Sequence, residues 1–221
     1  MQLPRTVGNR TLLPAISLLM LLPLSLSLGA APARAEPPDQ EAWLDNPTIT
    51  WNQPGDDILS PPEGMGVPAF CQDLVREPET DADRQIVAAG WKLVLGYESG
   101  WGTTIVRAAG GFDGNCRPSP FTAFFFVDGR YAGRSAPIPA WPRTDGALAS
   151  ATVASGGAVI ARYDRHGPNG PMCCPDGATI IIFAVDQTPD GPVMRPNPGR
   201  TLVAPDGRMI RQITPAPGSA S

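Results

Sequence analysis

The stretch FTAFFFVDGRYAG, residues 121–133, carries the strongest structural signal in the chain. Asp128 and Gly129 stand between two runs of aromatic and β-prone residues, which is the pattern of a hairpin with a two-residue turn. The register set by this turn pairs three phenylalanines with the following strand: Phe126 with Tyr131, Phe125 with Ala132, and Phe124 with Gly133. Successive phenylalanines point to opposite faces, so the strand is apolar on both sides. We therefore expect it at the centre of a sheet that is covered on both faces.

Other segments repeat this hairpin pattern. The runs ALASATVA and AVIARYD flank Ser155-Gly156-Gly157 and predict a second hairpin, whose later strand places Val159, Ala161 and Tyr163 on one face. The run ATIIIFAV, residues 178–185, predicts another strand that is apolar on both faces, turned back by Asp190-Gly191 into PVMR. TLVA and RMIRQI around Asp206-Gly207 predict a weaker fourth pair.

A helix should precede these strands. Thr80 with acids in the following turn is typical of a helix start, and Gly90 favours a left-handed exit, so we expect a helix over residues 80–89 with Ile86 and Ala89 facing inward. Residues 91–97 fit either helix or strand. The sequence thus predicts an α+β fold: an antiparallel sheet of about five to seven strands built from hairpins, with one N-terminal helix packed on it and disulfides stapling it. The alternative is a mainly-β sandwich or barrel.

The first 35 residues have the three-part layout of a secretory signal peptide. Arg5 and Arg10 precede an apolar run, and small residues end it, so we expect cleavage after Ala35. A transmembrane anchor is the alternative, but two prolines interrupt the run and no basic stop-transfer residues follow it. We expect export to the periplasm or the extracellular space and no membrane span in the mature chain.

The expected organisation has four parts. Residues 1–35 form the signal peptide, 36–68 a proline-rich extended lead that Trp43 and Trp51 could pin, 69–195 a single domain, and 196–221 a proline-rich tail with a disordered end.

The charge balance excludes several partners. The chain has 17 Lys and Arg against 21 Asp and Glu, a net charge of −4. The leader holds three arginines and no acid, so the mature chain has 14 basic residues against 21 acids, or −7. An acidic chain without a basic run is poorly suited to phosphate contacts, which argues against nucleic acids and anionic lipid surfaces.

Signatures of catalysis are missing from the sequence. The mature chain has a single histidine, His166, and no G-x-S-x-G motif, so a serine or cysteine nucleophile would lack an evident base. Four aspartates that could supply a carboxylate pair all precede glycine, where turn formation explains them: Asp113, Asp128, Asp145 and Asp176. We expect no enzymatic activity and no cofactor.

The stretch PMCCPDG, residues 171–177, places two adjacent cysteines near His166. Together with Met172, Cys173 and Cys174 are soft ligands that suit copper(I) or zinc. Adjacent cysteines of an extended chain point to opposite sides and cannot readily bind one ion. We expect no metal site.

The four cysteines form an even set, which in an exported chain indicates disulfides with three possible connectivities. One pairs Cys173 with Cys174 and Cys71 with Cys116. In the other two, the adjacent pair is tied to both Cys71 and Cys116. We favour these, because an extended Cys-Cys step sends one sulfur to each side and could join two segments to the strand that follows.

Three segments carry a resemblance to a known family. They are GFDGNCRPSPFTAFFFVDGRYAG, then PRTDGAL, then ARYDRHGPNGPMCCPDG followed by an apolar strand. Over about residues 80–195 the chain resembles the LppP/LprE family of bacterial cell-envelope proteins. The resemblance implies a cell-envelope location and carries no catalytic residue with it. The chain departs from the lipoprotein members because no lipobox cysteine follows the leader, so we expect a secreted relative without a lipid anchor.

The leading hypothesis is a non-enzymatic envelope protein that binds a small ligand, a wall component or a protein partner through its loops. The candidate binding residues are polar side chains beside glycine or proline: Arg117, Arg143, Asp145 and His166. The alternatives are a cell-wall hydrolase with a carboxylate pair and a copper or thiol-redox protein centred on Cys173 and Cys174.

Overall fold

The computed structural model describes residues 43–45, 51–62, 66–166, 171, 173–175 and 177–203, with the backbone alone described at 45 and 198–203. The chain divides into two units, Met1–Ala35 and Glu36–Ser221, and every described residue belongs to the second. Within these described ranges, no helix is long and apolar enough to cross a membrane.

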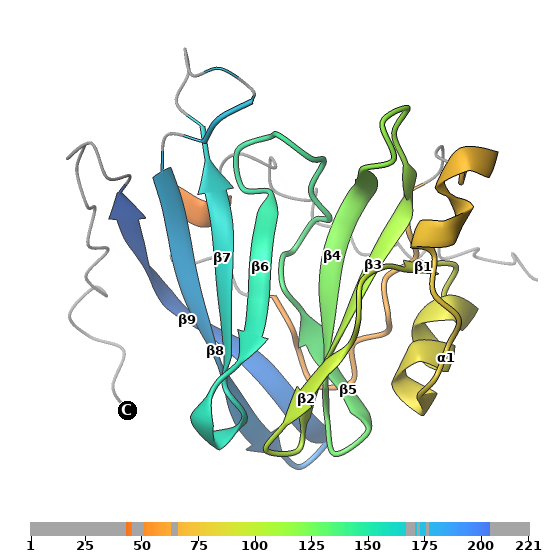
Figure 1. Ribbon diagram of the computed structural model, residues 1–221. Helices are drawn as coiled ribbons and strands as arrows, with labels where there is room; N and C mark the ends of the chain where they lie inside the picture. The colour runs from red at the N-terminus through yellow and green to blue at the C-terminus, as the bar shows by residue number, and fades with distance from the viewer. Residues whose placement is uncertain are drawn as a thin grey trace, which may run out of the picture. The chain divides into compact units, whose positions relative to one another are not determined.

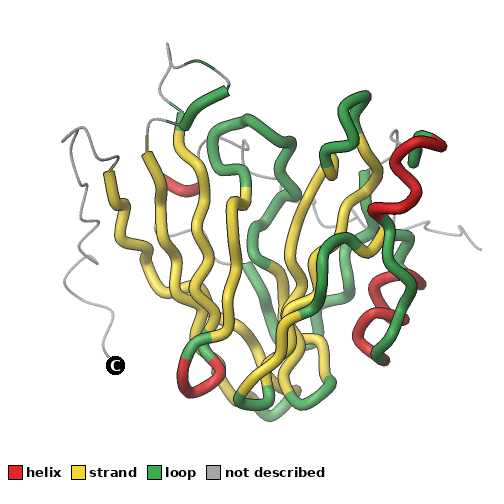
Figure 2. Tube along the Cα trace, in the orientation of Figure 1, coloured by secondary structure: helices red, strands yellow, loops and turns green. Residues whose placement is uncertain are grey.

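The second unit is mainly β (Figures 1 and 2). Its described strands, in chain order, are β1 (Lys92–Leu93), β2 (Glu98–Gly100), β3 (Thr103–Phe112), β4 (Pro118–Val127), β5 (Arg130–Arg134), β6 (Leu148–Val153), β7 (Val159–Arg165), β8 (Gly177–Thr188) and β9 (Gly191–Val203). The helical segments are α1 (Asp81–Ala88) and three 3-10 turns, η1 (Trp43–Asp45), η2 (Ala69–Leu74) and η3 (Ser155–Gly157).

The strands form two antiparallel sheets instead of one. The first has the order β1-β3-β4-β5, with β2 also paired to β3, and the second has the order β6-β7-β8-β9. The α+β expectation of a single sheet under one helix is therefore wrong, and the mainly-β alternative fits. The hairpins after residue 147 build their own sheet because their buried faces pack against the first sheet and not along its edge.

The central position expected for the phenylalanine-rich strand is confirmed. β4 lies between β3 and β5, and both its faces are buried. Phe125 belongs to the core between the two sheets, where its ring centroid lies 4.9 Å from that of Phe183. Phe124 and Phe126 pack on the other face, beneath α1. This strand therefore joins the two hydrophobic layers of the protein.

The predicted register of the first hairpin holds only next to its turn. Phe126 pairs with Tyr131 as expected, but a bulge follows, so that Phe125 pairs with Gly133 and Phe124 with Arg134. Gly133 adopts a φ of 132°, and a Cβ atom there would lie 2.2 Å from the side chain of Asn52. The approach of Asn52 thus explains both the glycine and the bulge, which the local pattern of the hairpin could not reveal.

Asn52 joins the two sheets at one side. Its Nδ2 donates to the carbonyl oxygen of Arg134 on β5 at 3.0 Å and to that of Met194 on β9 at 2.8 Å. Its Oδ1 accepts from the N–H of Arg134 at 2.8 Å. Nearby, the indoles of Trp43 and Trp51 fill the core between the sheets. The segment expected to be an extended lead therefore contributes to the core and to the seam.

Side chains also join the sheets at the opposite seam. Arg107 on β3 forms an ion pair with Glu98 on β2 at 3.0 Å, and its Nη2 donates to the carbonyl oxygen of Ala151 on β6 at 2.5 Å. Oε1 of Glu98 accepts the N–H of Val153 on β6 at 2.8 Å. These contacts satisfy backbone groups on the edge of β6 that no neighbouring strand pairs.

The second sheet differs from one expectation. The hairpin of β6 and β7 forms around η3 as predicted, with Val159, Ala161 and Tyr163 fully buried. The strand over residues 178–185, however, is buried on one face only, because Ile182 on its outer face is 46% exposed. The turn at Asp190-Gly191 into β9 is confirmed. The weaker pair around Asp206-Gly207 lies beyond the described residues, apart from the start of its first run at the end of β9.

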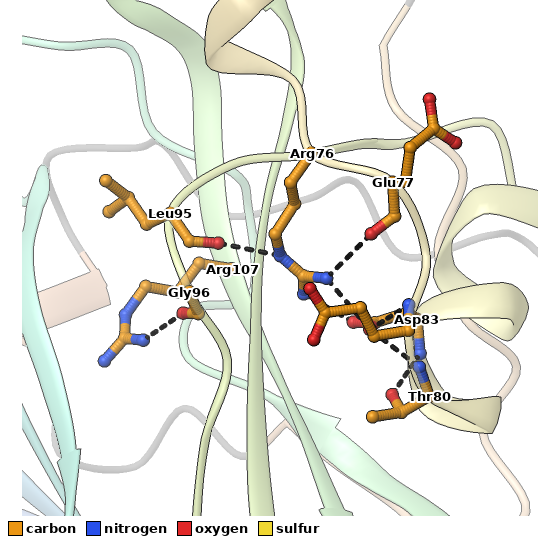
Figure 3. A network of polar contacts seen from close by, with 8 residues as sticks. Arg76, Glu77, Thr80, Asp83, Leu95, Gly96 and Arg107 are labelled. Carbon is orange, nitrogen blue, oxygen red and sulfur yellow. Dashed lines mark hydrogen bonds and ion pairs between the residues drawn. The ribbon is translucent and has the colours of Figure 1, made fainter.

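Helix α1 forms as predicted, with Thr80 as its N-cap and Gly90 in a left-handed conformation just after its end. Thr80 and Asp83 form a capping box, in which each side chain accepts from the other residue's backbone N–H. Asp83 also pairs with Arg76, at 2.5 Å, and its side chain is completely buried. Figure 3 shows Arg76 between this carboxylate and the carbonyl oxygen of Leu95.

The buried carboxylate makes stability depend on pH. Burial alone would raise the pKa of Asp83, but hydrogen bonds from the Arg76 side chain and from the N–H groups of Thr80 and Glu79 outweigh it and lower the pKa from 3.8 to about 2. Because the folded-state pKa is the lower one, this stabilisation is complete above about pH 4 and is lost as the pH falls toward 2. Its size is about 2 kcal/mol.

We predict that Asp83→Asn lowers the free energy of unfolding by about 3 kcal/mol at neutral pH, because Arg76 loses its partner and the capping box is broken. The matched control is Asp81→Asn, which removes an exposed carboxylate of the same helix and should cost less than about 0.5 kcal/mol. Urea unfolding at pH 7 and pH 2.5 measures both variants. The deficit of Asp83→Asn should shrink at pH 2.5; equal deficits at the two pH values would contradict the role given to the carboxylate.

Candidate functional site

A cavity of about 300 Å³ opens at the end of the sheets where β4 and β6 begin. Its lining comes from the segment between β1 and β2, from the turn between β3 and β4, from β4, from the connection between β5 and β6, and from the start of β6: Leu95, Arg117, Pro118, Phe121, Ala140, Trp141, Pro142, Ala147, Leu148 and Ala149. Arg117 is the one charged residue in this lining, among the residues the structure describes. The volume is at the small end of the range, roughly 300–1,000 Å³, that ligand pockets occupy.

The floor and the mouth of the cavity differ in exposure. Leu148 and Phe121 form the floor: Leu148 belongs to the core between the sheets, and Phe121 is partly buried and packs against that core. At the mouth, Leu95 is 62% exposed and Trp141 is 39% exposed. Large apolar side chains that remain exposed around a hollow are typical of a binding site.

Backbone hydrogen bonds fix the connection between β5 and β6 at two points. Near its middle, the backbone of Ala140 exchanges two hydrogen bonds with that of Phe121 on β4, at 2.8 and 3.3 Å. At its end, the N–H of Gly146 donates to the carbonyl oxygen of Asp164 on β7, and the N–H of Asp164 donates to the carbonyl oxygen of Ala147. Both distances are 2.8 Å. Trp141 thus stands between two points that backbone hydrogen bonds anchor to β4 and to β7.

Two arginines hold the opposite wall. The Nε of Arg76 donates to the carbonyl oxygen of Leu95 at 2.7 Å, and Nη1 of Arg107 donates to that of Gly96 at 2.8 Å (Figure 3). Leu95 has a positive φ of 60°, which an unsupported leucine rarely adopts. The ion pair that caps α1 therefore also positions a residue of the cavity.

The four residues predicted as binding candidates lie on three connections at the same end of the sheets (Figure 1). Arg117 lies between β3 and β4 and lines the cavity. Arg143 lies on the β5–β6 connection, directly after the lining residue Pro142. Asp145 lies near the end of the same connection, and His166 directly follows β7. The connections thus bring together residues that are distant in the sequence.

Arg117 is oriented by Asp113. Its Nε lies 3.2 Å from Oδ2 of Asp113, whose Oδ1 accepts the N–H groups of Asn115 and Arg117 itself at 2.8 and 2.9 Å. The backbone hydrogen bond from Arg117 and, in lesser part, the charges of Arg117 and Arg143 lower the pKa of Asp113. In the described part of the chain, no acceptor receives a hydrogen bond from the Nη groups of Arg117 or from the guanidinium of Arg143.

Asp145 and His166 have a different arrangement. The Asp145 carboxylate pairs with Nε of Arg165 at 2.9 Å and accepts the N–H of His166 at 2.7 Å. Asp145 thereby ties the end of β7 to the β5–β6 connection. Nδ1 of His166 is buried and has no hydrogen-bond partner among the described residues.

The favoured disulfide connectivity is wrong. Cys71 bonds to Cys116, with their Cα atoms 5.3 Å apart, whereas Cys173 and Cys174 are free and exposed. The bond lies in a small apolar cluster with Phe112, because η2 packs directly on the turn after β3. That contact between distant segments has no local sequence signal. Over the described residues, no group of three or more His, Cys, Asp or Glu side chains could hold a metal ion.

Sequence reasoning missed Trp141 and Leu95. Trp141 lies in the run PIPAWPR, where prolines surround one large aromatic residue, and this pattern could have marked it as an exposed loop aromatic. Leu95 gave no signal, since its place in the cavity depends on the arginines that hold its backbone.

No family model, curated protein or solved structure matches this chain in the comparisons made with known proteins.

We predict that Cys116→Ser lowers the free energy of unfolding by about 2–4 kcal/mol, because the bond closes a loop across a separation of 45 residues. Cys174→Ser removes an exposed thiol and should change stability by less than about 0.5 kcal/mol. Chemical unfolding of the two variants and peptide mapping without reduction provide the measurement. A mapped peptide that joins Cys71 or Cys116 to the Cys173-Cys174 segment would contradict this assignment.

Proposed function

We propose that this chain is an exported cell-envelope protein that binds a small ligand in the cavity beside Trp141 and catalyses no reaction. The observation that carries the proposal is the cavity itself, because its floor reaches the core, its mouth exposes Leu95 and Trp141, and backbone hydrogen bonds fix its walls. Such a site binds without rearrangement and therefore without a large entropic cost.

Export and an envelope location rest on the sequence. The charged start, apolar run and small-residue end of residues 1–35 support a removable leader, and the resemblance to the LppP/LprE family supports the envelope. Sequencing the N-terminus of the secreted chain checks this proposal, because removal of the leader after Ala35 leaves Glu36 as the first residue.

The candidate acids favour binding over hydrolysis. A hydrolase with a carboxylate pair needs one carboxyl group that stays protonated near neutral pH. Hydrogen bonds and arginine charges lower the pKa of Asp113, so it stays ionised, and Asp145 is engaged by Arg165 and by the backbone of His166. The Asp113 carboxylate positions Arg117, and the Asp145 carboxylate positions Arg165 and the backbone of His166.

A thiol-redox role is also less well supported. The hydrogen bond between the Cys174 thiol and the neighbouring Cys173 favours the protonated thiol and raises the pKa of Cys174. Because the thiolate is the reactive form, this shift makes Cys174 a poorer nucleophile than an ordinary cysteine.

We predict that Ala149→Trp, which adds an indole at an exposed residue of the cavity lining on β6, removes ligand binding. The matched control is Ala184→Trp, an exposed position on β8 away from the cavity. A ligand-detected NMR screen of small apolar fragments against the mature protein is the measurement. Fragments that bind the native protein and Ala184→Trp should fail to bind Ala149→Trp, whereas equal binding by all three proteins would place the binding site elsewhere.

A further inference from the structure

We infer that the cavity takes a small amphiphile whose apolar part enters toward Phe121 and Leu148 and whose single carboxylate binds the guanidinium groups of Arg117 and Arg143. The inference rests on the proposed function and adds the chemical class of the ligand to it. Two observations support it: the lining of the cavity is apolar, and a net positive charge lies beside that lining.

The apolar part of the ligand follows from the lining. Beyond Arg117, the lining side chains are leucine, phenylalanine, tryptophan, proline and alanine. A ligand placed against the exposed faces of Leu95 and Trp141 removes apolar surface from water, which is the main source of affinity in such a site. The small volume of about 300 Å³ selects a short acyl chain or one aromatic ring system over a long lipid.

The anionic head follows from the local charge. Arg117, Arg143 and Asp113 together carry one net positive charge beside the cavity, in a chain whose net charge is −4. Asp145 is matched by Arg165 and adds no net charge. A single surplus positive charge favours a monoanion, and a cation would be repelled from the same place.

The geometry of Arg117 suits a carboxylate. Asp113 contacts the Nε side of the guanidinium at 3.2 Å and so holds the side chain in place, while the Nη groups have no acceptor among the described residues. The Nη edge of an arginine can donate two parallel hydrogen bonds to a carboxylate. Asp113 is therefore a positioning residue for Arg117, whose guanidinium contacts the carboxylate of the ligand together with that of Arg143.

Calorimetric titration of the mature protein with octanoate, octan-1-ol and octylamine tests this inference. We expect octanoate to bind at least about tenfold more tightly than octan-1-ol, because charge-assisted hydrogen bonds add to the same apolar contact. Octylamine should bind more weakly than octan-1-ol. Raising the salt concentration should weaken the binding of octanoate and leave the affinity for octan-1-ol unchanged.

Matched variants separate the charge from the cavity. Arg117→Gln should lower the affinity for octanoate about tenfold without changing the affinity for octan-1-ol. Arg143→Gln, at an exposed position, tests the second guanidinium if Arg117→Gln destabilises the turn. Arg84→Gln removes the same charge from the exposed face of α1 and should leave octanoate affinity unchanged.

Two results would overturn the inference, and they are distinguishable. Equal affinity for octanoate and octan-1-ol, with both lost in Ala149→Trp, would reject carboxylate recognition while leaving the cavity as the binding site. Octanoate affinity that persists in Ala149→Trp would reject the cavity and the proposed function together.

Discussion

The burial of β4 on both faces is the constraint on which the two layers of this protein depend. Phe125 is fully buried between the sheets, and Phe124 and Phe126 are fully buried beneath α1. Each such side chain contributes about 1.5–3 kcal/mol relative to an exposed position. Because one strand supplies both layers, it fixes the position of the outer helix relative to the inner core. It also fixes where the connections that leave this strand begin.

The seams between the sheets connect the fold to the candidate site. Asn52 satisfies backbone groups of β5 and β9, and Glu98 with Arg107 satisfies those of β6. Since these side chains fix the two sheets relative to each other, the connections at one end meet in a constant arrangement. A cavity lies where they meet, with Arg117 at its rim.

Local sequence patterns predicted the elements well and the contacts between them poorly. The turn at Asp128-Gly129, the hairpin around η3 and the helix after Thr80 depend on neighbouring residues, and all three were predictable. The bulge opposite Phe125 depends on Asn52, far away in the chain, and the bond of Cys71 to Cys116 depends on the packing of η2. The loop arginines could be singled out from the sequence, but the cavity beside them could not, because it exists only where separate connections converge.

The central claim is that these converging connections form a ligand site whose apolar floor is the core between the sheets. The most direct measurement is an isotope-filtered NOE experiment on the purified protein with ¹³C-labelled octanoate, which reports which side chains lie next to each end of the ligand. The account predicts contacts from the terminal methyl group to Phe121 and Leu148, and from the methylene beside the carboxylate to Arg117. Contacts to Ile160 and Ile182 on the outer face of the second sheet, without contacts to Phe121 and Leu148, would contradict it.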